Sequence, residues 1–199
     1  MIKAVVFDFG GVLVKTDDPT GRVKWENRLG LPPGGLSRIV FDSPESSQAT
    51  LGQVPYTAVW EHVGQALSLP PADVNQLRQD FFGGDHLDQE LVAFLQGLRP
   101  RYKTGILSNA YSDGRKIIET TYQLGKAVDI IIISAEEKMA KPAPAIFQLA
   151  CSRLGVSPEE MVFVDDFLAN VKGAQSIGIR AYQYTNTREL LSELKLVLY

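Results

Sequence analysis

Short apolar runs recur along the chain, and their length and composition are those of buried strands. The first covers residues 3–9, and four more lie in the C-terminal half, at residues 103–109, 128–134, 160–166 and 178–184. Stretches with helical periodicity, such as LDQELVAFLQGL, alternate with these runs. Runs this uniformly apolar are typical of parallel strands that helices cover on both faces. The pattern therefore predicts an α/β fold.

The pattern changes between residues 15 and 87, where it predicts helices and no strand. Helical spacing of apolar positions is found at residues 35–43, 56–69 and 71–82. Stretches rich in proline and glycine separate these segments. We therefore expect a Rossmann-like, doubly wound parallel sheet built from residues 1–14 and 88–199, with residues 15–87 as a helical insert after the first strand.

Composition narrows the range of partners. The chain has 199 residues, 45% of them hydrophobic, and a net charge of −3. It offers no basic surface for nucleic acid or an anionic membrane, so we expect small polar ligands. A membrane span needs about 20 consecutive apolar residues, and no stretch of the chain approaches that length. We expect a cytoplasmic protein. We also expect it to be a monomer or a homodimer. The single cysteine, Cys151, has the spacing of a helix core residue, and we expect it to pack rather than react.

Three carboxylates stand at the ends of predicted strands. Asp8 lies within the first apolar run, and Asp165 and Asp166 end the fourth. Because the carboxyl ends of parallel strands meet at one edge of a sheet, these side chains are expected to converge there. Converging carboxylates repel one another unless a cation lies among them, and oxygen ligands favour Mg²⁺.

Further polar residues follow the same edge. Ser108 and Asn109 end the second strand, and Lys141 follows the third, just before a proline suited to a helix start. Each has a structural explanation when taken singly, since Ser108 and Asp166 suit helix N-caps and Lys141 suits a solvated surface. Their joint position at strand ends favours a functional site.

Four motifs contain these residues: FDFGGVL at residues 7–13, LSN at 107–109, KPAPAIF at 141–147 and FVDD at 163–166. In this order they resemble the motifs of the haloacid dehalogenase superfamily of hydrolases. The resemblance covers residues 1–14 and about 88–185. It implies that the insert is the helical cap of this superfamily, which opens and closes over the site with hinges near residues 14–18 and 83–87.

The resemblance also implies a role for each motif residue. Asp8 would attack a phosphoryl group and form an aspartyl-phosphate, and Lys141 would neutralise charge on the nucleophile and the phosphate. Phosphoryl oxygens would be held by Ser108, by the backbone around Asn109 and by the turn at Gly11, where glycine allows close approach. Mg²⁺ would be bound by the Gly10 carbonyl and by the carboxylates Asp8, Asp165 and Asp166.

One position departs from the family pattern. Phosphatases of the superfamily usually carry a second aspartate two residues after the nucleophile, as general acid and base, and this chain has Gly10 there. A positioned acid/base contributes ~10²–10⁴ in rate. Four side chains near or in the insert are candidates to replace it: Asp17, Asp18, His62 and His86. Candidates for substrate specificity are Arg22, Trp25, Arg28 and the same two histidines.

Three functions fit these residues. The favoured one is a Mg²⁺-dependent phosphatase that acts on a small phosphorylated metabolite, such as a sugar phosphate. A metal-independent 2-haloacid dehalogenase would use the same aspartate and also lack the second one, but would not need the acidic pair Asp165–Asp166. A degenerate binding module is the third. The joint presence of all four motif residues argues against it: Asp8, Ser108, Lys141 and Asp166.

Overall fold

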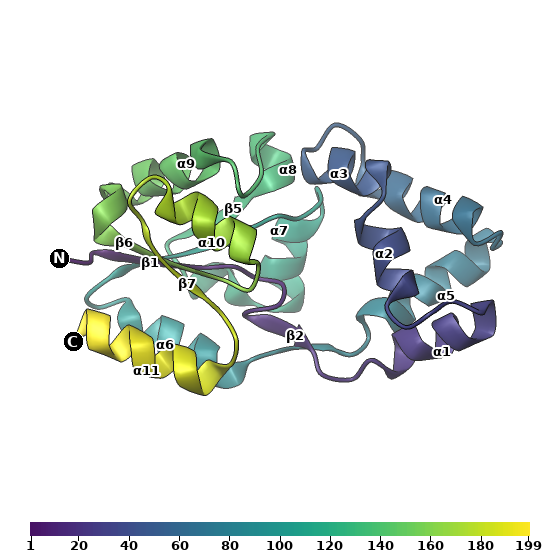
Figure 1. The fold of residues 1–199 in the computed structure, drawn as a ribbon, viewed down its shortest axis with the longest axis horizontal. Helices are drawn as coiled ribbons and strands as arrows, with labels where there is room; N and C mark the ends of the chain where they lie inside the picture. Colours follow the sequence, from purple (N-terminus) through teal and green to yellow (C-terminus); the bar gives the residue numbers. More distant parts are fainter.

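The computed structural model describes all 199 residues, which form a sheet domain and a helical insert side by side (Figure 1). The sheet domain is built on five parallel strands in the order β5-β4-β1-β6-β7. Their bounds are β1 Ala4–Phe7, β4 Lys103–Ser108, β5 Ile130–Ile133, β6 Met161–Asp165 and β7 Arg180–Gln183. Each of the five apolar runs contains one of these strands, and the predicted fold class is confirmed.

Helices cover both faces of the sheet (Figure 1). α6 (Gln89–Leu98) and α11 (Thr187–Leu198) pack on one face, and α9 (Pro144–Leu154) and α10 (Leu168–Gln175) on the other. Alternate residues of β1 belong to the two apolar cores, and all four are fully buried. This two-sided burial explains why β1 is apolar at every position. Cys151 lies buried in the second core, as predicted.

Short elements complete the sheet domain. They are α7 Gly114–Lys116, its π-helical continuation Ile117–Thr121, α8 Ser134–Glu137, and the 3₁₀ turns Leu124–Lys126 and Pro158–Glu160. α9 begins at Pro144, three residues beyond Lys141, and not directly after it as the first proline suggested. No helix in the chain is both long enough and apolar enough to cross a bilayer.

The insert consists of five helices: α1 Thr20–Leu29, α2 Gly35–Phe41, α3 Pro44–Thr50, α4 Tyr56–Ala66 and α5 Pro71–Phe82. They enclose an apolar core of their own, in which Trp25 and Phe81 are buried. The sequence pattern predicted three of them and missed α1 and α3. α3 begins where a break was expected, because the Ser43 hydroxyl accepts a bond from the Ser46 amide and caps the helix.

Two short strands connect the insert to the sheet domain. β2 (Val14–Thr16) and β3 (Asp85–Leu87) pair antiparallel, and the sequence pattern did not predict them. Arg22 of α1 closes the insert end of this ribbon, with Nη2 2.9 Å from the Thr16 hydroxyl and 3.2 Å from the Asp85 carboxylate. The residues expected to act as hinges are thus paired with each other.

The insert touches the sheet domain again near α3 and α8, which lie close together in Figure 1. Lys138 Nζ donates to the Gly52 carbonyl at 2.7 Å, and the Ser46 and Tyr111 hydroxyls are 2.8 Å apart. Gly52 has φ +60°, and a Cβ there would lie 2.1 Å from the Ala135 carbonyl oxygen. This approach therefore requires glycine. The ribbon and this contact hold the insert at the carboxyl ends of the strands.

Candidate active site

Asp8 directly follows β1, the central strand, and parallel register brings it beside the ends of β4 and β6. Phe7 is level with Ile106 on one side and Val164 on the other, so Asp8 lies next to Asp165. The Asp8 amide donates to the Val164 carbonyl at 2.8 Å, and the carboxylate accepts from the Phe9 amide at 2.6 Å. A rigid central strand thus fixes the predicted nucleophile.

Asp8 is almost completely buried, with 7% of its surface exposed. Burial raises the pKa of Asp8 to about 7, because desolvation outweighs the opposing influence of the Lys141 ammonium. Nearby Asp165 raises the pKa further. A cation at this site would favour the ionised form, which is the one that can act as a nucleophile.

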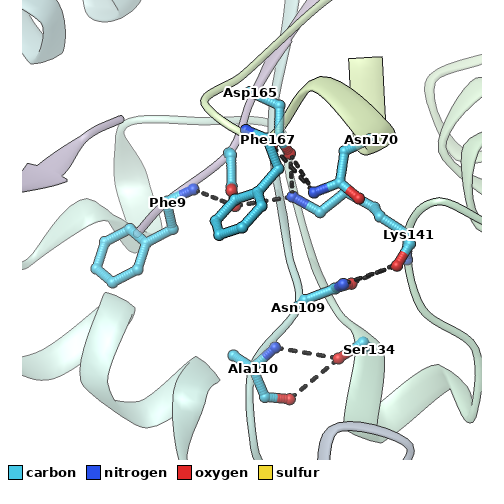
Figure 2. Close-up of polar contacts among 9 residues, drawn as sticks. Phe9, Asn109, Ala110, Ser134, Lys141, Asp165, Phe167 and Asn170 are labelled. Carbon is cyan, nitrogen blue, oxygen red and sulfur yellow. Dashed lines mark hydrogen bonds and ion pairs between the residues drawn. The ribbon is translucent and has the colours of Figure 1, made fainter. Parts of the chain in front are cut away.

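Lys141 is the positive centre of the site (Figure 2). Its ammonium lies 2.9 Å from Asp8 Oδ1 and 2.6 Å from Asp165 Oδ2, and its side chain has no exposed surface. The Asn109 side chain holds its backbone, accepting from the Lys141 amide and donating to the Lys141 carbonyl, both at 2.9 Å. The Asn109 amide group therefore positions the lysine, while its backbone remains available to a ligand.

Asp165 is an anchor for Lys141. Its Oδ1 accepts from the Phe167 amide at 2.8 Å, and Asn170 Nδ2 lies 3.0 and 3.1 Å from its two oxygens (Figure 2). Together with Lys141, these donors occupy both oxygens of the carboxylate. Sequence reasoning missed Asn170. The sequence shows only an asparagine five positions after Asp165, and its burial in the first turn of α10 is visible only in the structure.

Asp166, unlike Asp165, has a carboxylate oxygen without any hydrogen-bond donor. Its Oδ1 is buried and has no hydrogen-bond partner, which is rare for a carboxylate oxygen. Burial and the neighbouring Asp165 raise the pKa of Asp166. Gly11 faces the same carboxylate with φ +80°, and a Cβ at Gly11 would lie 2.3 Å from Asp166 Oδ2. The glycine therefore leaves room for this side chain.

The carboxylates fit a cation site. One oxygen each from Asp8, Asp165 and Asp166 lies within 4.8 Å of the others. Hard oxygen donors and an unpartnered buried carboxylate oxygen are suited to Mg²⁺. Since protein donors already occupy Asp165, the oxygens of Asp8 and Asp166 are the ones best able to bind such an ion directly.

Ser108 and Gly10 complete the surroundings of Asp8. Ser108 ends β4 and is 4% exposed, and no protein group hydrogen-bonds to its hydroxyl. Gly10 has open space where a side chain would be, with no atom within 4 Å of an ideal Cβ. The structure thus brings together the sequence-predicted residues Asp8, Gly10, Gly11, Ser108, Asn109, Lys141, Asp165 and Asp166.

The candidates for a replacement acid have partners elsewhere. His86 Nε2 and Asp17 Oδ2 are 2.6 Å apart on the ribbon, with about half or more of each side chain exposed. Asp18 accepts from the Thr20 amide at 3.0 Å.

The remaining candidates also have structural partners, within the insert and at its junction with the ribbon. His62 pairs with Glu45 at 3.2 Å. Trp25 donates to Asp80, Arg28 pairs with Asp73, and Arg22 closes the ribbon.

Known proteins of similar sequence include a much longer protein and a phosphatase of about the same length as this chain. Acyl-CoA dehydrogenase family member 10 from Mus musculus is 26% identical over 98% of this chain, which spans only 19% of that protein. D-ribitol-5-phosphate phosphatase from Bacteroides thetaiotaomicron is 26% identical, over 100% of this chain and 99% of its own length.

Solved structures share the fold. A HAD family enzyme from Bacteroides thetaiotaomicron, in complex with magnesium and inorganic phosphate, matches with TM-score 0.78 at 22% identity, over 96% of this chain and 99% of its own. L-2-haloacid dehalogenase from Xanthobacter autotrophicus, with chloropropionic acid covalently bound, matches with TM-score 0.69 at 23% identity, over 100% of this chain and 84% of its own. The sequence profile of haloacid dehalogenase-like hydrolases matches residues 2–178, and the chain belongs to this family.

Proposed function

We propose that this hydrolase is a Mg²⁺-dependent phosphatase that transfers the phosphoryl group of a small phosphorylated metabolite to Asp8 and then to water. The observation that carries the proposal is the buried, unpartnered Oδ1 of Asp166 beside Asp8. A cation there would neutralise negative charge on the carboxylates and on phosphoryl oxygens. A relative that spans the whole chain is named D-ribitol-5-phosphate phosphatase, which supports phosphatase activity on a small phosphorylated metabolite.

Each residue of the site has its own role in the proposed phosphoryl transfer. An Asp8 oxygen attacks phosphorus in line with the ester oxygen, which departs as the new bond forms. Lys141 lies 2.9 Å from Asp8 and balances the charge of the nucleophile and the incoming phosphate. The Ser108 hydroxyl and the backbone at Asn109 and Gly11 donate hydrogen bonds to the phosphoryl oxygens. Mg²⁺ would be held by Asp8, Asp166 and the Gly10 carbonyl, with Asp165 as anchor of the lysine.

We also propose that residues 15–87 act as a cap that excludes water during the reaction. The two-stranded ribbon and the Gly52 contact support this role, because they attach the insert to the sheet domain beside the strand ends. Contacts of Arg22, Trp25 and Arg28 stabilise the insert and its junction in this arrangement.

Dehalogenase activity is the competing function, and two observations favour it. Glycine stands at residue 10, where phosphatases of the family usually carry the aspartate that acts as acid and base. In addition, one structural neighbour is an L-2-haloacid dehalogenase. Against it stands Asp166, since displacement of halide from carbon needs no cation and gives no reason for a buried carboxylate oxygen without a partner.

A substrate screen with matched conditions separates the two. Phosphate release from a set of phosphorylated metabolites is measured with Mg²⁺ and with chelator, and halide release from 2-chloropropionate is measured in parallel. We expect phosphate release that chelator abolishes and Mg²⁺ restores. Halide release that is indifferent to chelator, without phosphate release, would establish the dehalogenase function instead.

A further inference from the structure

The position two residues after the nucleophile has no proton donor, and the structure leaves it empty. Gly10 carries no side chain, and the place of its Cβ has no other atom within 4 Å. No neighbouring side chain therefore occupies the space from which an acid at this position would act.

The acidic and imidazole side chains that the sequence suggested as replacements have partners elsewhere. Asp17 and His86 pair with each other, and the Asp18 carboxylate accepts from the Thr20 amide. On the ribbon, Asp85 accepts from Arg22 and from the Thr16 hydroxyl. Within the insert, His62 Nδ1 lies 3.2 Å from a Glu45 carboxylate oxygen.

The groups that do touch Asp8 have other tasks. Lys141 is shared between Asp8 and Asp165, so its protons are directed at two carboxylates. Asp166, under the proposed function, is a cation ligand. Neither Lys141 nor Asp166 is therefore free to protonate an ester oxygen as it departs.

We infer that this enzyme selects phosphorylated substrates by the acidity of their leaving groups. The inference rests on the proposed phosphatase function. As the bond from Asp8 oxygen to phosphorus forms, the bond from phosphorus to the ester oxygen breaks, and that oxygen keeps the electron pair. It leaves as an anion and takes a proton from solvent afterwards. Aryl phosphates, acyl phosphates and sugars phosphorylated at the anomeric carbon are the preferred classes, and primary alkyl phosphates react slowly.

The absence of an acid or base at residue 10 also affects the second step, hydrolysis of the aspartyl-phosphate. Water attacks the phosphorus of the aspartyl-phosphate, the bond to Asp8 oxygen breaks with its electron pair returning to the carboxylate, and the water proton passes to solvent or to phosphate. No base at residue 10 accepts this proton, so hydrolysis of the intermediate is slow. Good substrates of different structure then share one kcat, which hydrolysis sets.

The test is a leaving-group series, from substituted phenyl phosphates to primary alkyl phosphates, with kcat/KM measured for the wild type in Mg²⁺. We expect kcat/KM to rise steeply with leaving-group acidity. Gly10→Asp supplies the missing acid in open space, and Gly10→Asn has the same shape without the proton. Gly10→Asp should flatten the dependence and raise kcat/KM for alkyl phosphates by ~10²-fold or more, whereas Gly10→Asn keeps the steep slope.

The outcomes separate this inference from the proposed function. If kcat/KM of the wild type does not depend on leaving-group acidity, another group supplies the proton. That result would overturn selection by leaving group but not the proposed phosphatase function. A slope that stays steep in folded Gly10→Asp would overturn the assignment of the missing acid to residue 10. Absence of phosphate release from every ester, with Mg²⁺ present, would remove the phosphatase and this inference together.

Discussion

At the scale of single residues, Lys141 joins two carboxylates that would otherwise repel each other. Its removal in Lys141→Ala leaves Asp8 and Asp165 buried without a counter-charge, a change that costs about 3–5 kcal/mol when a buried ion pair is broken. We expect turnover to be lost and the melting temperature to fall. Ser108→Ala, which breaks no ion pair, should impair kcat without that loss of stability. Equal and negligible effects of both changes on turnover would refute the roles given to these residues.

Asn170 is a positioning residue because it acts on Lys141 only through Asp165. In Asn170→Ala the Asp165 oxygens lose one donor, and the ammonium loses its fixed position. We expect kcat to fall ~10–100-fold, as for other supporting residues around charged sites, with KM changed little. Steady-state kinetics measures this split, and Asn170→Asp is the matched variant, which places a like charge beside Asp165 and should be worse. An unchanged kcat in Asn170→Ala would show that Lys141 and the Phe167 amide hold Asp165 unaided.

The raised pKa of Asp8 predicts a pH dependence of cation binding. Its pKa is about 7 in the folded protein and has an ordinary, lower value in the unfolded chain. Between these values the native state binds a proton that the unfolded state has lost, so the contribution of Asp8 to stability grows as the pH falls through 7. Mg²⁺ competes with that proton. We expect the Mg²⁺-induced rise in melting temperature to be larger at about pH 8 than at about pH 5.5. A larger rise at the lower pH would contradict this.

At the scale of elements, the Gly52 contact tests how the insert sits on the sheet domain. Gly52→Ala adds a methyl group 2.1 Å from the Ala135 carbonyl oxygen and must displace the insert. Gly30→Ala is the matched control, since Gly30 has a similar φ of +66° but open space around its Cβ. Both changes should cost about 1 kcal/mol of backbone strain.

Only Gly52→Ala should also alter the reaction. We expect it to lower kcat/KM and to speed proteolytic cleavage near the ribbon, because the insert is no longer held at its second contact. Equal kinetics for the two variants would mean that this contact has no part in covering the site.

The elements also show what the sequence made predictable. The strands were predicted because burial on both faces of the sheet fills the inner ones mainly with apolar residues. α5 was predicted to the residue because Pro71 begins it. α1 was missed because it buries only Trp25 and Glu26, which leaves no apolar stripe. The ribbon was missed because its strands are three residues long and its side chains are held by polar contacts.

In the site, residue types at strand ends were predictable, since register follows from parallel pairing. The different surroundings of Asp165, which anchors Lys141, and of Asp166, which has an unpartnered oxygen, were not predictable. They depend on the Asn170 amide and the Phe167 backbone, whose positions arise only when α10 forms.

At the scale of the whole molecule, a rigid sheet edge and an attached insert serve one proposed covalent step at Asp8. The slow second step makes that covalent step observable, because the aspartyl-phosphate should accumulate. Intact-mass analysis of the protein after mixing with an aryl phosphate and Mg²⁺ detects this intermediate. We expect one phosphoryl adduct on the wild type, absent with chelator and absent in folded Asp8→Asn. An adduct on Asp8→Asn, or phosphate release by that variant above a few per cent of wild type, would contradict the covalent step at Asp8.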